Sequence, residues 1–197
     1  MPRADDVHRL PDDLPVPVDD GACDHLPGTR LPPVELASTL GRRVRLDGLP
    51  GRTVVYCYPR TGRPDEDPPP GWNQIPGARG CTPETCGFRD HHGGFLDLGV
   101  RVLGLSTQST AEQREMTGRL GVPFEVVSDA ELRLAGALGL PTFEVAGMTL
   151  VKRLTLVVGD GAIEHVFYPV FPPDRHAAEV LAWLRTAQPG KAFTPLP

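Results

Sequence analysis

Cys81 and Cys86 stand five residues apart in the segment GARGCTPETCGFRDHH, residues 77–92. The three residues after Cys81 are typical of a helix start: Thr82 can cap the helix, a proline suits the first turn, and a glutamate is favoured near the positive end of the helix dipole. A thiol at a helix N-terminus can have a pKa well below its free value of about 8.5, because unpaired backbone N–H groups and the dipole favour the thiolate. The segment therefore predicts a nucleophilic thiol at Cys81.

The spacing of the two cysteines argues against a permanent disulfide. In an ideal helix five residues rise about 7.5 Å and turn about 140°, so the two Cα atoms would lie roughly 8–9 Å apart. A disulfide tolerates about 7 Å, so a bond between Cys81 and Cys86 would require the first turn to unwind. Such unwinding is expected of an attacking and a resolving cysteine in a redox cycle.

Two other interpretations of the cysteine pair stay open on these residues alone. The cysteines could fill the inner face of the helix as small apolar side chains. They could also bind zinc together with His91 and His92, although adjacent histidines on a helix point apart and C-x-x-x-x-C within a helix is a poor zinc geometry.

Composition narrows the class of protein. The chain has 197 residues and a formal net charge of -5 with no block of lysine or arginine, which gives no electrostatic footprint for nucleic acid. No stretch approaches the roughly 20 apolar residues of a membrane span, and the N-terminal sequence lacks the apolar core of a signal peptide. We therefore expect a cytoplasmic protein without nucleic-acid or membrane partners. Thiols are mostly reduced in that compartment, so a close cysteine pair favours chemistry over a structural disulfide.

The elements that would position the cysteines follow one another as strands and helices. Residues 52–58, RTVVYCY, predict a buried central strand that leads toward Cys81, and 100–107 predict a second one. The other expected elements are short edge strands or a hairpin within 34–49, helices over 82–99, 109–121, 130–140 and 174–187, a short strand at 124–129, and two strands joined by a Gly-Asp-Gly turn within 151–170. The order predicts an α/β fold with a central mixed β-sheet flanked by helices on both faces.

Three segments are expected along the chain. Residues 1–28 are polar and proline-rich and predict an N-terminal extension, 29–188 form the domain, and 189–197 form a C-terminal tail. Within the domain, residues 59–80 are too rich in proline and glycine for regular structure, and loops of that length are usually functional or disordered. Trp72 in this loop either covers the site or anchors the loop. Cys57 is expected in the core and Cys23 in the extension as a thiol without function.

The segment CTPETCGFRD resembles the C-T-x-E-x-C-x-F-R-D signature of the peroxiredoxins of the bacterioferritin-comigratory, or Q, type, in the AhpC/TSA superfamily. TVVYCYP resembles the strand that leads into the active-site loop of this family, and KRLTLVVGDGAI resembles its R-x-T-F-x-I-D-x-x-G segment. In order and spacing the resemblance covers about residues 31–185.

The resemblance implies a thioredoxin-like fold. It also implies that Cys81 is the peroxidatic cysteine, which attacks the peroxide and becomes a sulfenic acid, and that Cys86 is the resolving cysteine. Arg153 falls where the family carries an active-site arginine, which would hold the thiolate and polarise the peroxide oxygens. No metal, haem or flavin cofactor is implied.

One departure concerns the residues before Cys81. The family carries P-x-x-x-T-x-x-C, whereas here an alanine stands three residues before Cys81 and a glutamine seven before it. Pro76 is then the candidate for the shielding proline, and Thr82 or Thr61 for the hydroxyl that contacts the thiolate.

These observations predict a thiol peroxidase that reduces hydrogen peroxide or small organic hydroperoxides. An intramolecular disulfide would resolve the sulfenic acid, and a thioredoxin- or glutaredoxin-type donor would recycle the enzyme, which is expected to be a monomer or homodimer. The alternative is a non-catalytic thioredoxin-like redox sensor or binding domain, which the missing threonine motivates.

Overall fold

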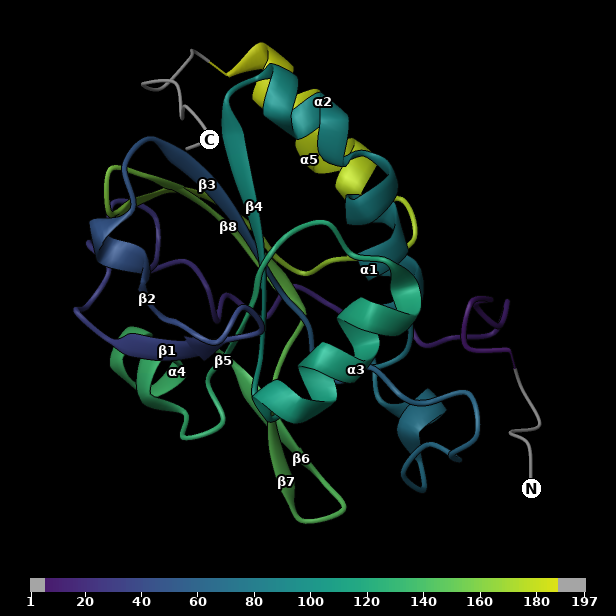
Figure 1. The fold of residues 1–197 in the computed structure, drawn as a ribbon. Helices are drawn as coiled ribbons and strands as arrows, with labels where there is room; N and C mark the ends of the chain where they lie inside the picture. The colour runs from purple at the N-terminus through teal and green to yellow at the C-terminus, as the bar shows by residue number, and fades with distance from the viewer. Residues whose placement is uncertain (1–5, 188–197) are drawn as a thin grey trace.

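The computed structural model describes residues 6–187, so the predicted tail at 189–197 and the first five residues of the predicted extension lie outside the described residues. A seven-stranded mixed sheet runs through the molecule in the order β2-β1-β5-β4-β3-β8-β9 (Figure 1). Its strands are β1 (Glu35–Ser38), β2 (Arg43–Arg45), β3 (Arg52–Cys57), β4 (Val100–Ser106), β5 (Val126–Ser128), β8 (Leu154–Gly159) and β9 (Ala162–Phe167).

Strand β3 occupies an inner position, parallel to β4 and antiparallel to β8. All six of its residues are buried, and they alternate between two hydrophobic cores. Val54 and Tyr56 face one core, and Val55 and Cys57 face the other. The predicted central strand is confirmed, and so is the placement of Cys57 in the core.

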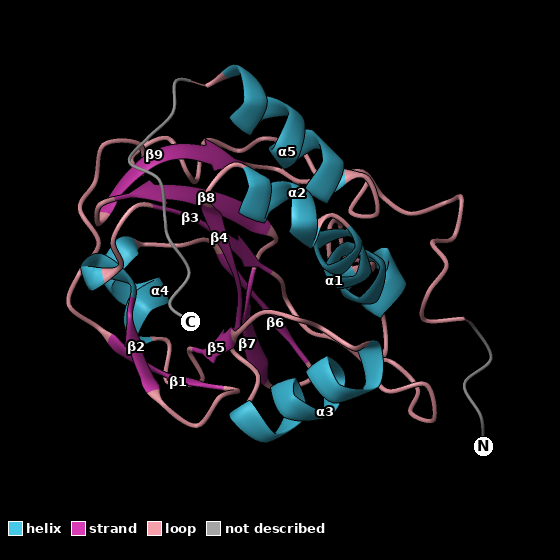
Figure 2. Cartoon of the chain, turned by 45° about the horizontal axis from the view of Figure 1, so that its top comes forward, coloured by secondary structure: helices cyan, strands magenta, loops and turns pink. Residues whose placement is uncertain are grey.

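Helices cover both faces of the sheet, as predicted (Figure 2). One face carries α1 (Cys81–Asp90), α2 (His92–Asp97), α3 (Thr110–Leu120) and α5 (His176–Thr186), and the other carries α4 (Arg133–Leu138). The described chain also contains two short 3-10 helices, η1 (Leu46–Gly48) and η2 (Trp72–Gln74). No helix between residues 6 and 187 has the length and apolar character needed to cross a membrane.

The start of α1 differs from the prediction. The helix begins at Cys81 after Gly80, so the expectation that Thr82 caps it is wrong. Gly80 has φ of 106°, and a Cβ there would lie 2.3 Å from Cγ of Pro173. Only glycine can make this close approach in the left-handed conformation, and it takes the place of a hydroxyl cap.

Two further elements differ from the sequence-based expectation. The helix expected over 82–99 is interrupted at His91, whose backbone leaves the helical conformation, so that α1 and α2 are separate. The structure also contains a hairpin of β6 (Thr142–Val145) and β7 (Met148–Val151) that was not predicted. Its turn places Ala146 and Gly147 at φ of 48° and 74°, a turn for which the sequence lacks the usual Asn-Gly signal.

The described part of the predicted extension is packed more closely than its polar composition suggests. Residues 6–28 contain no helix or strand, yet Cys23 and Leu26 are buried in the core on the α4 face of the sheet. The loop at 59–80 is also packed, because Trp72 is buried and its ring centroid lies 6.2 Å from that of Phe143 in β6. Trp72 therefore anchors the loop to the hairpin.

Candidate active site

Cys81 is the first residue of α1 and is buried, with 3% of its surface exposed. Because the helix begins there, the thiol lies beside the unpaired backbone N–H groups of the first turn. Its Sγ donates to the carbonyl of Ala78 across 3.6 Å and accepts a hydrogen bond from the backbone of Arg60. The sequence-based position of Cys81 at the start of a helix is thus confirmed.

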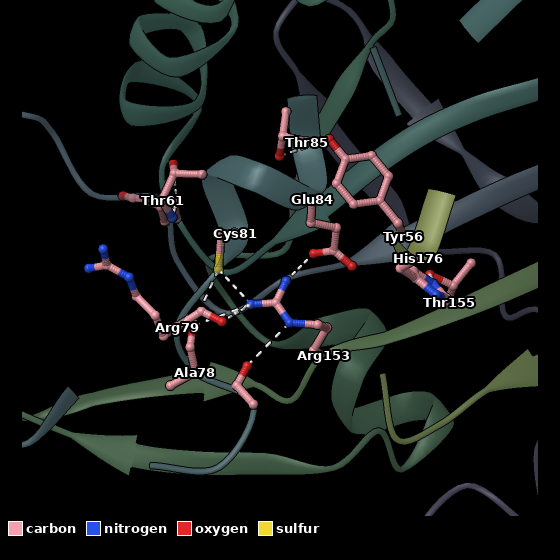
Figure 3. Close-up of polar contacts among 12 residues, drawn as sticks. Tyr56, Thr61, Ala78, Arg79, Cys81, Glu84, Thr85, Arg153, Thr155 and His176 are labelled. Carbon is pink, nitrogen blue, oxygen red and sulfur yellow. Dashed lines mark hydrogen bonds and ion pairs between the residues drawn. The ribbon is translucent and has the colours of Figure 1, made fainter. Parts of the chain in front are cut away.

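Arg153, 72 residues further along the chain, brings a positive charge to Cys81. It lies just before β8, and its Nη2 donates to Cys81 Sγ across 3.2 Å (Figure 3). The same guanidinium donates to the carbonyls of Gly77, Ala78 and Arg79, at 3.2, 3.3 and 3.2 Å. The arginine is therefore fixed by the backbone of the three residues that lead to Gly80 and the helix.

Glu84 is the second ionisable side chain that contacts the Arg153 guanidinium, after Cys81. Its carboxylate forms a buried ion pair with Nη1 of Arg153, and neither side chain is exposed by more than 1%. Burial raises the pKa of Glu84 to about 7, against the opposing effect of Arg153. The sequence suggested only that Glu84 stabilises the helix dipole, because nothing local to residues 81–90 indicates that an arginine 69 residues away would pair with it.

Cys81 and Glu84 compete for one cation. The pKa of Cys81 lies above its ordinary value, because burial outweighs Arg153, which lowers it, and the charge on Glu84 adds to the rise. The lowered pKa expected from the helix N-terminus is therefore wrong for the reduced, closed site. Burial also works against the charge on Arg153, yet its pKa is raised because Cys81 and Glu84 both stabilise the cation. When Glu84 is protonated, its charge no longer raises the pKa of Cys81. Arg153 then stabilises the Cys81 thiolate without this opposing charge.

Cys86 lies in the same helix, as predicted, and it is half buried. Both cysteines are free thiols. Burial raises the pKa of Cys86, and Arg89 is the first of the influences that oppose it. Since α1 is continuous from Cys81 to Asp90, the ideal-helix separation of roughly 8–9 Å between the two Cα atoms applies, and a bond between the sulfurs requires the first turn to open.

The other predicted site residues are distributed unevenly. Thr82 is buried and lines the cavity at Cys81, whereas Thr61 is buried beside it and engages Gln108 through its backbone N–H and its hydroxyl. Pro76 is exposed and faces a different hollow, while Pro68 and Pro69 line the Cys81 cavity. Within residues 6–187, the polar contacts recorded for the Cys81 sulfur come from Arg153, the Ala78 carbonyl and the Arg60 backbone, and none is a hydroxyl.

The two histidines of the zinc alternative have separate surroundings. Nδ1 of His91 lies 2.9 Å from the carbonyl of Gly87 in its own helix, whereas the His92 ring packs against Phe124 with centroids 5.4 Å apart. In the chain between residues 6 and 187, no group of three or more histidine, cysteine or acidic side chains is arranged to hold a metal ion.

The cavity at Cys81 has a volume of about 30 Å³. Its walls come from Cys81 and Thr82 in α1, from Pro68 and Trp72 in the long loop, and from Val7 near the N-terminus. The arrangement can stabilise a thiolate in a space that holds a very small reactant, beside a fixed guanidinium that can polarise it.

Comparison with known proteins is consistent with this chemistry. Residues 26–181 match the Redoxin family. The chain is 31% identical over 161 residues to the chloroplastic peroxiredoxin Q of Oryza sativa subsp. japonica, an alignment that covers 81% of this chain and 66% of the rice protein. It is 27% identical over 161 residues to a peroxiredoxin bcp of Coxiella burnetii, with 80% and 97% covered.

A solved structure is also similar. The crystal structure of peroxidoxin BcpB from Mycobacterium tuberculosis superposes with a TM-score of 0.67 at 27% identity, over 83% of this chain and 99% of the other. The chain thus spans nearly the whole of the bacterial relatives and 66% of the rice protein.

Proposed function

Because the chain belongs to the redoxin family and, within it, to the peroxiredoxins of the Q type, we propose that it is a thiol peroxidase in which Cys81 is the peroxidatic cysteine. The observation that carries the proposal is the 3.2 Å contact between Arg153 Nη2 and the buried Cys81 Sγ at the start of α1, beside a small cavity. A charge-assisted donor at this distance stabilises the thiolate, which is the nucleophilic form of cysteine.

In the first step the Cys81 thiolate attacks one oxygen of the hydroperoxide. The S–O bond forms as the O–O bond breaks, Cys81 becomes a sulfenic acid, and the leaving oxygen takes a proton and departs as water or an alcohol. Arg153 donates toward the reacting sulfur, so its charge stabilises the negative charge that moves onto the oxygens.

In the second step Cys86 attacks the sulfenic acid. An S–S bond replaces the S–O bond, and the hydroxyl leaves as water with the proton of the Cys86 thiol. The start of α1 must open to allow this bond, and its position at a helix terminus after a long loop favours local opening. A dithiol donor of the thioredoxin or glutaredoxin type then reduces the disulfide and is itself oxidised.

The enzyme is proposed to be a monomer or homodimer and to act in the cytoplasm. Its proposed substrates are hydrogen peroxide or small organic hydroperoxides. The plant relatives are named as chloroplastic, so a fractionation experiment with the native host is the test of compartment.

A second candidate function is redox sensing without turnover. It is favoured by one observation, that Ala78 occupies the position of the family threonine and only non-hydroxyl groups of the described chain contact the Cys81 sulfur. Steady-state consumption of hydrogen peroxide with a thioredoxin or glutaredoxin system separates the two functions. The peroxidase turns over many times per chain and loses activity in Cys81→Ser, whereas a sensor consumes about one equivalent and stops.

A further inference from the structure

The N-terminal segment forms part of the wall around Cys81. We call residues 6–20 the strap, and they lie on the same side of the molecule as α1 and the loop at 60–80 (Figure 1). Val7 is an apolar residue in a polar stretch, yet only 7% of it is exposed, because it lines the cavity that contains Cys81. A segment whose sequence predicted an extension outside the fold thus contributes directly to the site.

Arg79 holds this part of the strap in place. Its Nη2 donates to the carbonyl of Asp6 across 2.8 Å and to that of Arg9 across 3.3 Å. These hydrogen bonds hold the backbone on both sides of Val7. Arg79 is itself 5% exposed and lines the same cavity, two residues before Cys81. The position of Val7 is therefore tied to the backbone that positions the thiol.

The strap is fixed at two more points. Leu10 packs on Gly80, since a Cβ on that glycine would lie 2.9 Å from Cδ2 of Leu10. Further along, the Asp20 carboxylate accepts from Nζ of Lys152 and from the hydroxyl of Tyr168, each across 2.8 Å. Lys152 precedes Arg153 in the chain, so both ends of the strap are attached beside residues of the active site.

The wall leaves little space in front of the thiol. The cavity at Cys81 has a volume of about 30 Å³, against 260, 400, 340 and 220 Å³ for four other hollows of the described chain. Hydrogen peroxide consists of two oxygen atoms, whereas an organic hydroperoxide adds a carbon chain. The apolar parts of the wall, Val7, Pro68, Pro69 and Trp72, would have to move to admit that chain.

Resting on the proposed peroxidase function, we propose that the strap determines substrate specificity: Val7, held by Arg79, closes the Cys81 cavity to alkyl groups and makes hydrogen peroxide the preferred substrate. Closure by a packed side chain discriminates by size, and a difference of one or a few methylene groups in a pocket changes rates by about 10–200-fold.

The experiment measures single-turnover oxidation of the reduced full-length chain, without any reductant, by stopped-flow fluorescence of Trp72 beside the thiol. The peroxides are hydrogen peroxide, tert-butyl hydroperoxide and cumene hydroperoxide. The variants are Val7→Ala, which shortens the wall, and Arg79→Met, which removes both hydrogen bonds from Nη2 to the strap. The control is Val18→Ala, the same change in the same segment at a side chain that is 80% exposed.

In the unchanged chain the second-order rate constant is expected to be at least ten-fold higher for hydrogen peroxide than for cumene hydroperoxide. Val7→Ala and Arg79→Met should each lower that ratio by about ten-fold, as expected for a pocket enlarged by a few methylene groups, and Val18→Ala should leave it unchanged. Equal rate constants for all three peroxides in the unchanged chain, or a ratio that neither variant alters, overturns the role of the strap and leaves the peroxidase intact. If no peroxide oxidises Cys81, the peroxidase function is wrong and this inference is wrong with it.

Discussion

Replacing Arg153 with methionine removes the positive charge nearest to the Cys81 sulfur while keeping a long apolar side chain. The lost contact is a buried charge-assisted hydrogen bond of 3.2 Å, and such bonds contribute about 1.5–3 kcal/mol. One pKa unit corresponds to about 1.4 kcal/mol, so the pKa of Cys81 should rise by about 1–2 units. At a pH below that pKa, the thiolate fraction and the rate constant for peroxide should fall by about 10–100-fold.

The assay is the second-order rate constant for hydrogen peroxide between pH 5 and 9. Because the thiolate reacts and burial raises the pKa of Cys81, the rate should rise with pH across this range, and Arg153→Met should move the rise to higher pH. Glu84→Gln should act in the opposite direction, since the charge on Glu84 raises the pKa of Cys81. Its effect should be greatest above pH 7, where Glu84 is ionised, and small at pH 5. Coincident profiles for Arg153→Met and the unchanged chain would refute the electrostatic role of the arginine.

Two other changes test the helix that carries the cysteines. Cys86→Ser should keep its first turnover but stop at a sulfenic acid on Cys81, which a dimedone adduct detects by mass spectrometry. A dithiol donor should no longer sustain turnover in this variant. Sustained turnover would exclude Cys86 as the resolving residue. Gly80→Ala should lower the free energy of unfolding by about 2 kcal/mol or more, because of the left-handed backbone and the contact with Pro173. Gly118 in α3 has open space around the position of a Cβ, so Gly118→Ala should not lower it. Urea denaturation measures both, and equal stabilities would show that Gly80 is not required for the close approach.

Much of the fold could be predicted because its signals are local. The apolar residues 54–57 indicate a buried strand, and Ser109 with Glu112 forms the capping box that begins α3. The arrangement as an α/β sheet with helices on both faces is confirmed, as is the thioredoxin-like class through the similarity to BcpB. The β6–β7 hairpin was missed because its turn uses Ala146 at positive φ, which alanine rarely adopts.

The site could be predicted only in part, because its parts meet through tertiary packing. Cys81 and Cys86 were singled out by their type and spacing and Arg153 by the family resemblance, and the structure brings Arg153 to Cys81. The pairing of Glu84 with Arg153 depends on β8 lying beside β3, which no local pattern encodes. The same is true of Val7, whose burial depends on an arginine more than seventy residues away in the sequence.

A single-turnover experiment that locates the oxidised sulfur tests the role of Cys81 most directly. The reduced chain receives one equivalent of hydrogen peroxide, its remaining thiols are alkylated, and peptides are mapped by mass spectrometry, with amide exchange followed across residues 81–90. The expected result is a link between Cys81 and Cys86 and faster amide exchange across α1 in the oxidised form. Cys57 and Cys23 should stay outside any disulfide. Oxidation that spares Cys81, or a disulfide through Cys23 or Cys57, would contradict it.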